Sequence, residues 1–285
     1  MKKVIVILGQ TATGKSSLAV KIARKINGEI ISADSRQVYK GLDIGTGKIT
    51  KNEMRGVPHH LINVANPKKQ FTVAEYKQIA DRKILEILSR GNTPIICGGT
   101  GFYIDAITMG LVLPEVPPNK KLRSILSKKK SETLFRMLQK LDVQRARSID
   151  PNNKVRLIRA IEIAKALGKV PRLVAKKPRF KFVKIGLYLP PDVLRKKVKV
   201  RVKKMFKAGL LREVKGLKRS GVSNNRLREL GFEYYNPTYE SVVNATMQYA
   251  KRQMTWFKRD KKIKWFTSAP SALASFPKLW AKEIR

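Results

Sequence analysis

The chain has 285 residues, of which 42% are hydrophobic, so it can bury a real core and a disordered chain is excluded. Its formal charge of +42 at pH 7 predicts a polyanionic partner, with nucleic acid the leading candidate, although Lys-rich surfaces also arise from genome composition or growth temperature. The chain has a single cysteine, Cys97, which excludes a disulfide framework. A membrane span needs about 20 apolar residues, and no segment approaches this length, so we expect a soluble, cytoplasmic protein.

The first feature along the chain is a phosphate-binding motif. An apolar run at residues 4–8 predicts a buried strand, and it leads into GQTATGKS, which has the pattern G-x-x-x-x-G-K-[ST]. In such a loop, backbone N–H groups and the N-terminal end of the next helix bind phosphate, while the lysine adds a positive charge. The predicted phosphate-binding residues are Gly9, Gln10, Thr11, Ala12, Thr13, Gly14, Lys15 and Ser16, and the Ser16 hydroxyl is the predicted ligand of Mg²⁺. Kinases, NTPases and some transferases all use this loop.

Strands and helices then alternate along the chain. The pattern predicts helices over 15–26, 71–90 and 192–209, a further helix from residue 101, and strands at 29–33, 60–65, 93–99 and 184–189. This alternation indicates an α/β fold of the P-loop NTPase type, in which helices flank a parallel sheet. Ligands of such folds bind at the carboxyl ends of the strands, so the polar segments that follow the strands are expected to meet in one cleft.

The alternation stops at a proline-containing, basic segment, residues 110–121, and helical stretches are predicted at about 120–140 and 151–167. We expect a catalytic core at 1–111 and 150–285, and a mostly helical insertion at 112–149 that stands over the cleft. Residues 120–219 contain 33 Lys and Arg against 6 Asp and Glu, so the excess charge is concentrated there and suggests a basic face.

Two polar residues follow predicted strands at positions where chemistry can occur. Asp34 would lie opposite the phosphate loop, where its carboxylate could accept a proton or bind a metal, but an aspartate there could equally cap the next helix. Thr100 could orient a substrate or merely satisfy a turn. His59 and His60 precede an apolar run, which favours a structural role for both.

Seven motifs, taken in order, carry a resemblance to one enzyme family. They are GQTATGKSSLA, ISADSRQVYKGLDIGTGK, GVPHHLI, VAEY, GGTGFYI, DPNNKVRLIRAIEI and ATMQYAKRQMTWFKRD. The chain thereby resembles the tRNA dimethylallyltransferases, also called tRNA isopentenyltransferases, over residues 4–110, about 142–164 and 187–260. The resemblance implies transfer of a dimethylallyl group from dimethylallyl diphosphate to the exocyclic amine of the adenosine 3′ of the anticodon, with release of pyrophosphate.

The resemblance also implies roles for individual residues. Asp34 is implied to be the general base, Thr100 to orient the amine or the bridging oxygen, and Arg252 to bind the diphosphate together with the phosphate loop. Residues implied to contact the tRNA anticodon stem-loop are Asp34, Ser35, Arg36, Gln37, Thr100, Arg123, Arg156, Arg159, Arg228, Gly231, Lys251, Arg252, Gln253 and Trp256. We further expect Mg²⁺ as cofactor and a monomer.

Two residues depart from the pattern of the family. Gln10 stands where proline is usual, at a position whose side chain is not expected to touch phosphate. Met247 occupies a position where many relatives carry arginine. Lys15 and Arg252 would then have to neutralise more of the negative charge of the diphosphate.

Three other functions are compatible with the phosphate loop. An adenylate isopentenyltransferase would modify free AMP or ATP, and it would need neither the charge of +42 nor a basic insertion. A nucleoside kinase would use the loop for phosphoryl transfer from ATP, and a non-catalytic RNA-binding module would not require Lys15, Ser16 and Asp34 together. Consumption of dimethylallyl diphosphate or of ATP in the presence of tRNA separates the enzymes.

Overall fold

The computed structural model describes residues 2–175 and 177–282 and divides them into two compact units. The larger unit consists of residues 2–110 and 177–282, and the smaller one of residues 111–175. No helix in these described ranges is long and apolar enough to cross a membrane.

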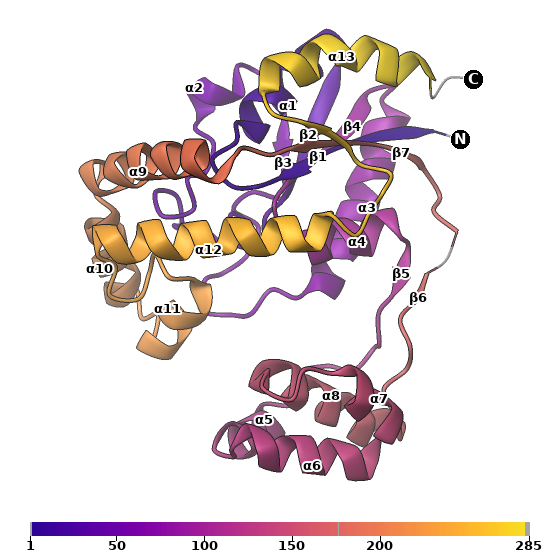
Figure 1. Ribbon diagram of the computed structural model, residues 1–285, viewed down its shortest axis with the longest axis vertical. Coiled ribbons are helices and arrows are strands. Elements are labelled where there is room, and N and C mark those ends of the chain that lie inside the picture. Colours follow the sequence, from indigo (N-terminus) through magenta and orange to yellow (C-terminus); the bar gives the residue numbers. More distant parts are fainter. Residues whose placement is uncertain (1, 176, 283–285) are drawn as a thin grey trace. The chain divides into compact units, whose positions relative to one another are not determined.

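The larger unit is built on a six-stranded sheet in which all neighbouring strands are parallel (Figure 1). The strand order is β3-β2-β4-β1-β7-β8. The strands are β1 (Lys3–Gly9), β2 (Gly28–Ala33), β3 (His59–His60), β4 (Thr93–Gly98), β7 (Lys181–Leu187) and β8 (Lys264–Phe266). The parallel sheet flanked by helices confirms the fold class that the sequence predicts.

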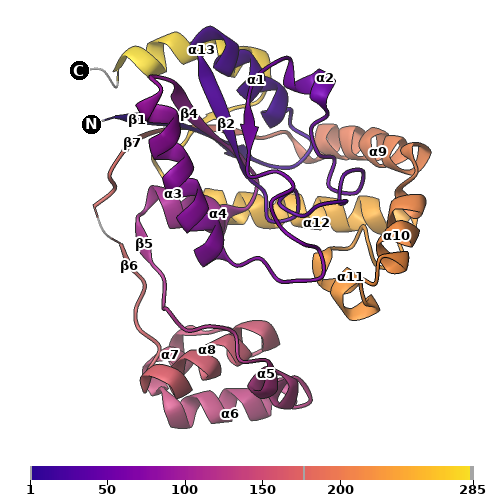
Figure 2. The same ribbon diagram turned by 180° about the vertical axis from the view of Figure 1, so that it is seen from behind.

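Helices cover both faces of the sheet because the strands are apolar on both sides. In β1, Val4 and Val6 belong to one hydrophobic cluster, while Ile5 and Ile7 belong to the other. The cluster around Ile5 and Ile7 includes residues of α1 (Lys15–Lys25) and α13 (Ala269–Lys282). The cluster around Val4 and Val6 includes residues of α3 (Val73–Ser89), α4 (Gly101–Thr108) and α12 (Tyr239–Phe257), on the opposite face (Figures 1 and 2).

The remaining helices of the larger unit lie beside the carboxyl-end loops of the sheet. They are α2 (Lys51–Met54), α9 (Pro191–Ala208), α10 (Leu210–Arg219) and α11 (Asn224–Leu230). Helix α9 packs along α12 through a separate apolar cluster that includes Val198, Val202, Val243 and Ala250. The basic residues of α9 occupy its other faces, so the periodicity of its apolar positions fixes which side meets α12.

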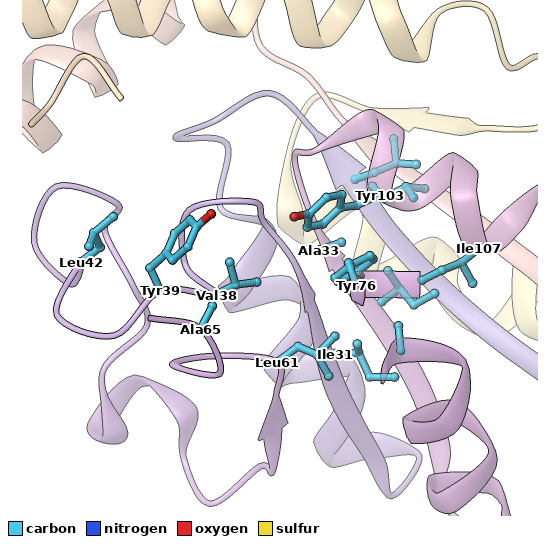
Figure 3. Packing of buried hydrophobic residues seen from close by; sticks show 14 of the residues in the cluster. Ile31, Ala33, Val38, Tyr39, Leu42, Leu61, Ala65, Tyr76, Tyr103 and Ile107 are labelled. Carbon is cyan, nitrogen blue, oxygen red and sulfur yellow. The ribbon is translucent and has the colours of Figure 1, made fainter. Parts of the chain in front are cut away.

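The predicted strand at 60–65 is wrong in its extent, because β3 contains only His59 and His60. Leu61 and Asn63 have φ angles of 60° and 59°, and these left-handed conformations interrupt an extended strand. The apolar residues of this segment are nevertheless buried: Leu61 and Ala65 pack in the same cluster as Tyr39 (Figure 3). The apolar run resembles a strand in sequence because its residues are buried, although its backbone is not extended.

The smaller unit is helical. It contains α5 (Lys120–Ser127), α6 (Ser131–Leu141), α7 (Val143–Ser148), α8 (Lys154–Leu167) and an antiparallel pair of β5 (Leu111–Val112) and β6 (Val174–Ala175). The structure places residues 150–175 here, whereas the sequence assigned them to the core. The reason is shared burial, because Leu157 and Ile161 of α8 pack with Leu134 and Leu138 of α6.

A buried carboxylate joins several elements at the edge of the sheet. Glu29 on β2 accepts hydrogen bonds from Arg90 and from Asn92, and lies 2.6 Å from Nε2 of His60. Burial alone would raise the pKa of Glu29, but hydrogen bonds from Asn92, Arg90 and His60 outweigh it and lower the pKa to about 2.

The low pKa of Glu29 predicts that the protein loses stability in acid. A pKa below the ordinary value of 4.5 means that ionised Glu29 stabilises the fold above pH 4.5, and that this stabilisation is lost as the pH falls toward 2. Glu29→Gln should therefore be less stable than the wild type at pH 7, and the difference should shrink on acidification. Denaturant unfolding at pH 7, 4.5 and 3 measures it, and a difference that stays constant over this range contradicts the prediction.

Candidate functional site

The phosphate loop has the tight curl that its glycines allow. Gly9 ends β1 with a φ of 128°, and a Cβ there would lie 2.0 Å from the carbonyl oxygen of Leu187, so only glycine fits. Gly14 is the left-handed N-cap of α1, and the buried Thr13 hydroxyl donates to the carbonyl of Gln10 at 2.8 Å. The loop therefore leads directly into the N-terminus of α1, where anions bind.

A cavity of about 520 Å³ opens in front of this loop. Its walls include Thr11, Ala12, Gly14, Lys15, Ser16, Asp34, Gln37, Thr46, Gly47, Cys97, Gly99, Arg201, Tyr249 and Gln253. Three predicted loop residues, Gly9, Gln10 and Thr13, do not line it. The side chain of Gln10 instead accepts a buried hydrogen bond from the backbone N–H of Leu189, which agrees with its expected lack of phosphate contact.

Desolvation shifts the pKa values of two titratable residues of the cavity wall in opposite directions. Burial lowers the pKa of Lys15 to about 8, so its ammonium group is still largely protonated at neutral pH. That ammonium group donates to the carbonyl of Gln10 and is thereby held over the loop. Burial raises the pKa of the Cys97 thiol to about 12, so this sulfur stays neutral and is a poor nucleophile.

Asp34 does not cap a helix, but its carboxylate is partly used for local structure. Its Oδ1 accepts hydrogen bonds from the backbone N–H groups of Arg36 at 2.9 Å and Gln37 at 3.2 Å, so it caps the turn after β2. No helix follows there. The residue also lines the cavity, and among the described residues Oδ2 has no hydrogen-bond partner. One oxygen is thus used for local structure, and the other is available to a ligand.

Thr100 does not line the cavity but supports residues that surround it. Its Oγ1 accepts from the backbone N–H of Ser35 at 2.9 Å and lies 3.3 Å from the Ser35 hydroxyl. Burial raises the pKa of Tyr249, a cavity residue, to about 12, although a hydrogen bond with Thr100 opposes the rise. In this arrangement Thr100 positions the turn that carries Asp34.

Arg201 is one of several cavity residues that the sequence reasoning missed, with Thr46, Gly47 and Tyr249. It comes from the middle of α9, where it is one of many basic residues, and it lines the cavity. Its Nη2 donates to the carbonyl of Thr46 at 2.9 Å. Burial lowers its pKa, although Asp34 and Glu233 nearby partly offset this effect. The available signal was its place on α9 next to Val202, on the side that packs toward α12.

Gln253 is buried, lines the cavity and links α12 to two of its loops. Its Oε1 accepts from the N–H of Thr11 at 2.8 Å, and its Nε2 donates to the carbonyl of Gly99 at 3.0 Å. Trp256, one turn later on α12, donates from Nε1 to Asp105 at 2.8 Å. Gln253 therefore joins α12 to the loops that follow β1 and β4, and Trp256 joins α12 to α4.

Arg36 is held in an aromatic cluster next to the cavity. Its guanidinium group pairs with Glu233 and lies 4.7 Å from the ring centroid of Phe232 and 5.4 Å from that of Tyr249. Gly231 is buried directly beside this pair. A second cavity of about 40 Å³ lies here, and it shares Thr11, Asp34, Thr46, Arg201 and Tyr249 with the larger one.

The arginines predicted to contact tRNA fall into two groups. Arg123 and Arg159 of the smaller unit both pair with Glu162, whose side chain is 2% exposed, so these arginines hold their own unit together. Arg156, on the same helix, is exposed. In the larger unit Arg228, Lys251 and Arg252 are exposed; Arg228 stacks on Tyr235, and Arg252 lies 5.9 Å from the ring of Tyr249. Arg252 does not line the cavity.

The cavity offers few metal ligands of its own. No group of three or more His, Cys, Asp or Glu that could hold a metal occurs in the described part of the chain. The Ser16 hydroxyl and the Asp34 carboxylate both line the cavity, and oxygen donors of this kind suit Mg²⁺ that takes its remaining ligands from a bound phosphate and water. The residues present therefore fit a magnesium ion that arrives with a phosphorylated ligand.

Comparison with known proteins gives a consistent result. A model of the IPP transferase family matches residues 37–260, a range that begins after the phosphate loop. The chain is 40% identical over 283 residues to a tRNA dimethylallyltransferase of Halothermothrix orenii, covering 92% of this chain and 86% of that protein. It is 40% identical to a tRNA dimethylallyltransferase of Caldanaerobacter subterraneus, covering 93% and 91%.

Solved structures agree in fold and in coverage. The crystal structure of a tRNA isopentenylpyrophosphate transferase from Bacillus halodurans has a TM-score of 0.73 and 34% identity, and the match covers 99% of this chain and 96% of that one. A eukaryotic dimethylallyltransferase acting on tRNA has a TM-score of 0.78 and 28% identity, covering 94% and 74%.

Proposed function

The chain belongs to the IPP transferase family, and we propose that it transfers a dimethylallyl group from dimethylallyl diphosphate to the exocyclic amine of the adenosine 3′ of the anticodon in tRNA. The observation that carries the proposal is the shared cavity of about 520 Å³. It places a loop built for phosphate and a carboxylate with one free oxygen, Asp34, on the walls of one space.

The loop and cationic side chains of the cavity wall would hold the diphosphate. Thr11, Ala12, Gly14, Lys15 and Ser16 line the cavity at the N-terminus of α1, and Lys15 and Arg201 bring positive charge to it. Negative charge accumulates on the leaving diphosphate as the carbon–oxygen bond breaks, and these donors stabilise it. Many relatives carry an arginine at position 247, whereas Met247 packs against an apolar cluster here. Arg201 supplies a positive charge to the cavity in its place.

Magnesium would add to this stabilisation. We propose that the Ser16 hydroxyl holds it on the diphosphate side of the cavity. When bound, Mg²⁺ neutralises charge on the diphosphate and so makes it a better leaving group.

Asp34 would act on the nucleophile. The adenine amine is conjugated into the purine ring and is a weak nucleophile until it loses a proton. As its nitrogen forms the bond to the allylic carbon and the carbon–oxygen bond breaks, Oδ2 of Asp34 accepts the amine proton. Thr100 and Ser35 keep the turn that carries this carboxylate in place.

The adenine must leave the anticodon loop to reach Asp34, and extruding a base costs a few kcal/mol. Binding energy from the RNA backbone offsets this cost. The exposed cations Arg156, Arg228, Lys251 and Arg252 are the proposed contacts among the predicted residues. We also propose that the protein is a monomer and acts in the cytoplasm, where its buried thiol stays reduced.

The test is mass spectrometry of tRNA nucleosides after incubation with the protein, Mg²⁺ and dimethylallyl diphosphate. We expect one adenosine to gain a dimethylallyl group, and a tRNA with guanosine at that position to remain unmodified. Parallel reactions with free AMP and with ATP test an adenylate isopentenyltransferase and a kinase. Prenylation of AMP without modification of tRNA contradicts the proposal.

Arg156 gives a prediction about RNA binding. Because Arg156 is exposed, Arg156→Gln should weaken tRNA binding and reduce the slope of log K against log salt concentration by about one. Fluorescence titrations between low and physiological salt measure this slope. Lys25→Gln, which removes an exposed charge at the end of α1, is the control for net charge alone. An unchanged slope in the Arg156 variant places that residue outside the interface.

A further inference from the structure

A carboxylate outside the cavity organises one of its walls. Glu213, in α10, accepts hydrogen bonds from three consecutive backbone N–H groups: Asp43 at 2.9 Å and Ile44 at 2.7 Å on Oε2, and Gly45 at 3.0 Å on Oε1. The hydroxyl of Tyr234 donates to the same Oε1 at 3.0 Å. Both oxygens are thus used, and neither lines the cavity.

The loop that Glu213 holds, residues 43–47, leads directly to the proposed donor site. Thr46 and Gly47 line the larger cavity, and Gly45 and Thr46 line the smaller one. The carbonyl of Thr46 accepts from Nη2 of Arg201 at 2.9 Å and from the side-chain amide of Gln37 at 3.5 Å. Two side chains of the cavity therefore take their orientation from a carbonyl in this loop.

The loop has little room to find another arrangement. Gly47 has a φ of 55°, and a Cβ there would lie 2.1 Å from the guanidinium group of Arg201. Thr46 also donates through its hydroxyl to the carbonyl of Leu42 at 2.6 Å. A displacement of the amides at 43–45 would therefore move the Thr46 carbonyl and, with it, the contact to Arg201.

We propose that Glu213 is a positioning residue for the diphosphate donor, because it fixes the loop whose carbonyl orients Arg201 toward the cavity. This role rests on the proposed function, because it assumes that the ligand of the cavity is a diphosphate. It gives Glu213, one of 6 acidic residues in the basic stretch 120–219, a role that is separate from RNA binding.

Glu213→Gln tests this role with almost no change in shape. Each carboxylate oxygen accepts two donors, so whichever oxygen becomes an amide nitrogen will face N–H or O–H groups that need an acceptor. We expect the affinity for inorganic pyrophosphate with Mg²⁺, measured by calorimetry, to fall about tenfold, while tRNA affinity stays at the wild-type value. Tyr234→Phe is the matched control, since it removes one donor and leaves the three backbone contacts; it should bind pyrophosphate like the wild type.

A double-mutant cycle separates positioning from general damage to the fold. If Glu213 acts through Arg201, the combined Glu213→Gln and Arg201→Met variant should bind pyrophosphate no more weakly than Arg201→Met alone. Fully additive losses, or equal losses of pyrophosphate and tRNA affinity, overturn the proposal. If the glutamine variant does not fold, Glu213→Asp, which keeps the charge but shortens the side chain, decides the question: weaker pyrophosphate binding supports the role, and wild-type binding refutes it.

The same titrations distinguish this proposal from the function on which it rests. Normal pyrophosphate binding by Glu213→Gln refutes the role of Glu213 and leaves the proposed function intact. Failure of the wild type to bind pyrophosphate refutes the diphosphate site itself, and the role of Glu213 with it.

Discussion

The Asp34→Asn variant should modify tRNA about two to four orders of magnitude more slowly than the wild type, with nearly unchanged tRNA affinity. Asparagine keeps an oxygen that can accept from the backbone N–H groups of Arg36 and Gln37, so the turn after β2 is preserved. It cannot accept the amine proton. Single-turnover kinetics with enzyme in excess over tRNA measure the chemical step without product release.

Asp34→Ala serves as the comparison, because it removes both the turn contact and the proton acceptor. We expect the alanine variant to lose as much turnover as the asparagine variant and to lose some stability in addition. Two results contradict the role of general base: wild-type turnover in Asp34→Asn, or a large loss of tRNA affinity with normal turnover.

Replacing Glu162 by alanine should destabilise the smaller unit by about 3 kcal/mol. Glu162 is 2% exposed and accepts from the N–H of Asn119 at 2.6 Å, from Arg123 at 2.7 and 2.9 Å, and from Arg159. Without it, two guanidinium groups repel each other across α5 and α8. The remaining exposure of both arginines limits the cost to the lower end of the range for broken buried ion pairs.

Hydrogen exchange followed by mass spectrometry measures this effect, because it reports on residues 111–175 separately from the larger unit. Exchange should accelerate in α5, α6 and α8 and remain unchanged in the parallel sheet. Glu132→Ala, which removes an exposed glutamate from α6, is the matched control and should leave exchange unaltered. Equal protection in Glu162→Ala and the wild type would mean that the smaller unit does not depend on the Glu162 ion pairs, and it contradicts the prediction.

The parts of the site that sequence predicted are those whose signal is local. The glycines around Lys15 define the phosphate loop within eight residues, and Asp34 follows its strand at the edge where ligands of parallel sheets bind. The parallel sheet itself follows from alternating strand and helix patterns. None of these inferences requires knowledge of which distant side chains meet.

The parts that sequence missed depend on distant partners. Arg201 stands among many basic residues of α9, and only the packing of α9 on α12 turns it toward the cavity. Arg123 and Gln253 resemble RNA contacts in sequence, and only the structure shows that they also bond to Glu162 and Thr11. For Arg123 the available signal was a rare acidic residue within a basic stretch, since Glu162 and Glu213 both serve as internal acceptors.

The hydrogen bonds of Gln253 connect α12 to the phosphate loop. One amide side chain joins the N–H of Thr11 to the carbonyl of Gly99, so the ends of β1 and β4 are fastened to the same point on α12. The two residues before it, Lys251 and Arg252, face solvent. Any displacement of α12 that an anion caused at these two side chains would therefore be transmitted to the phosphate loop through the single side chain of Gln253.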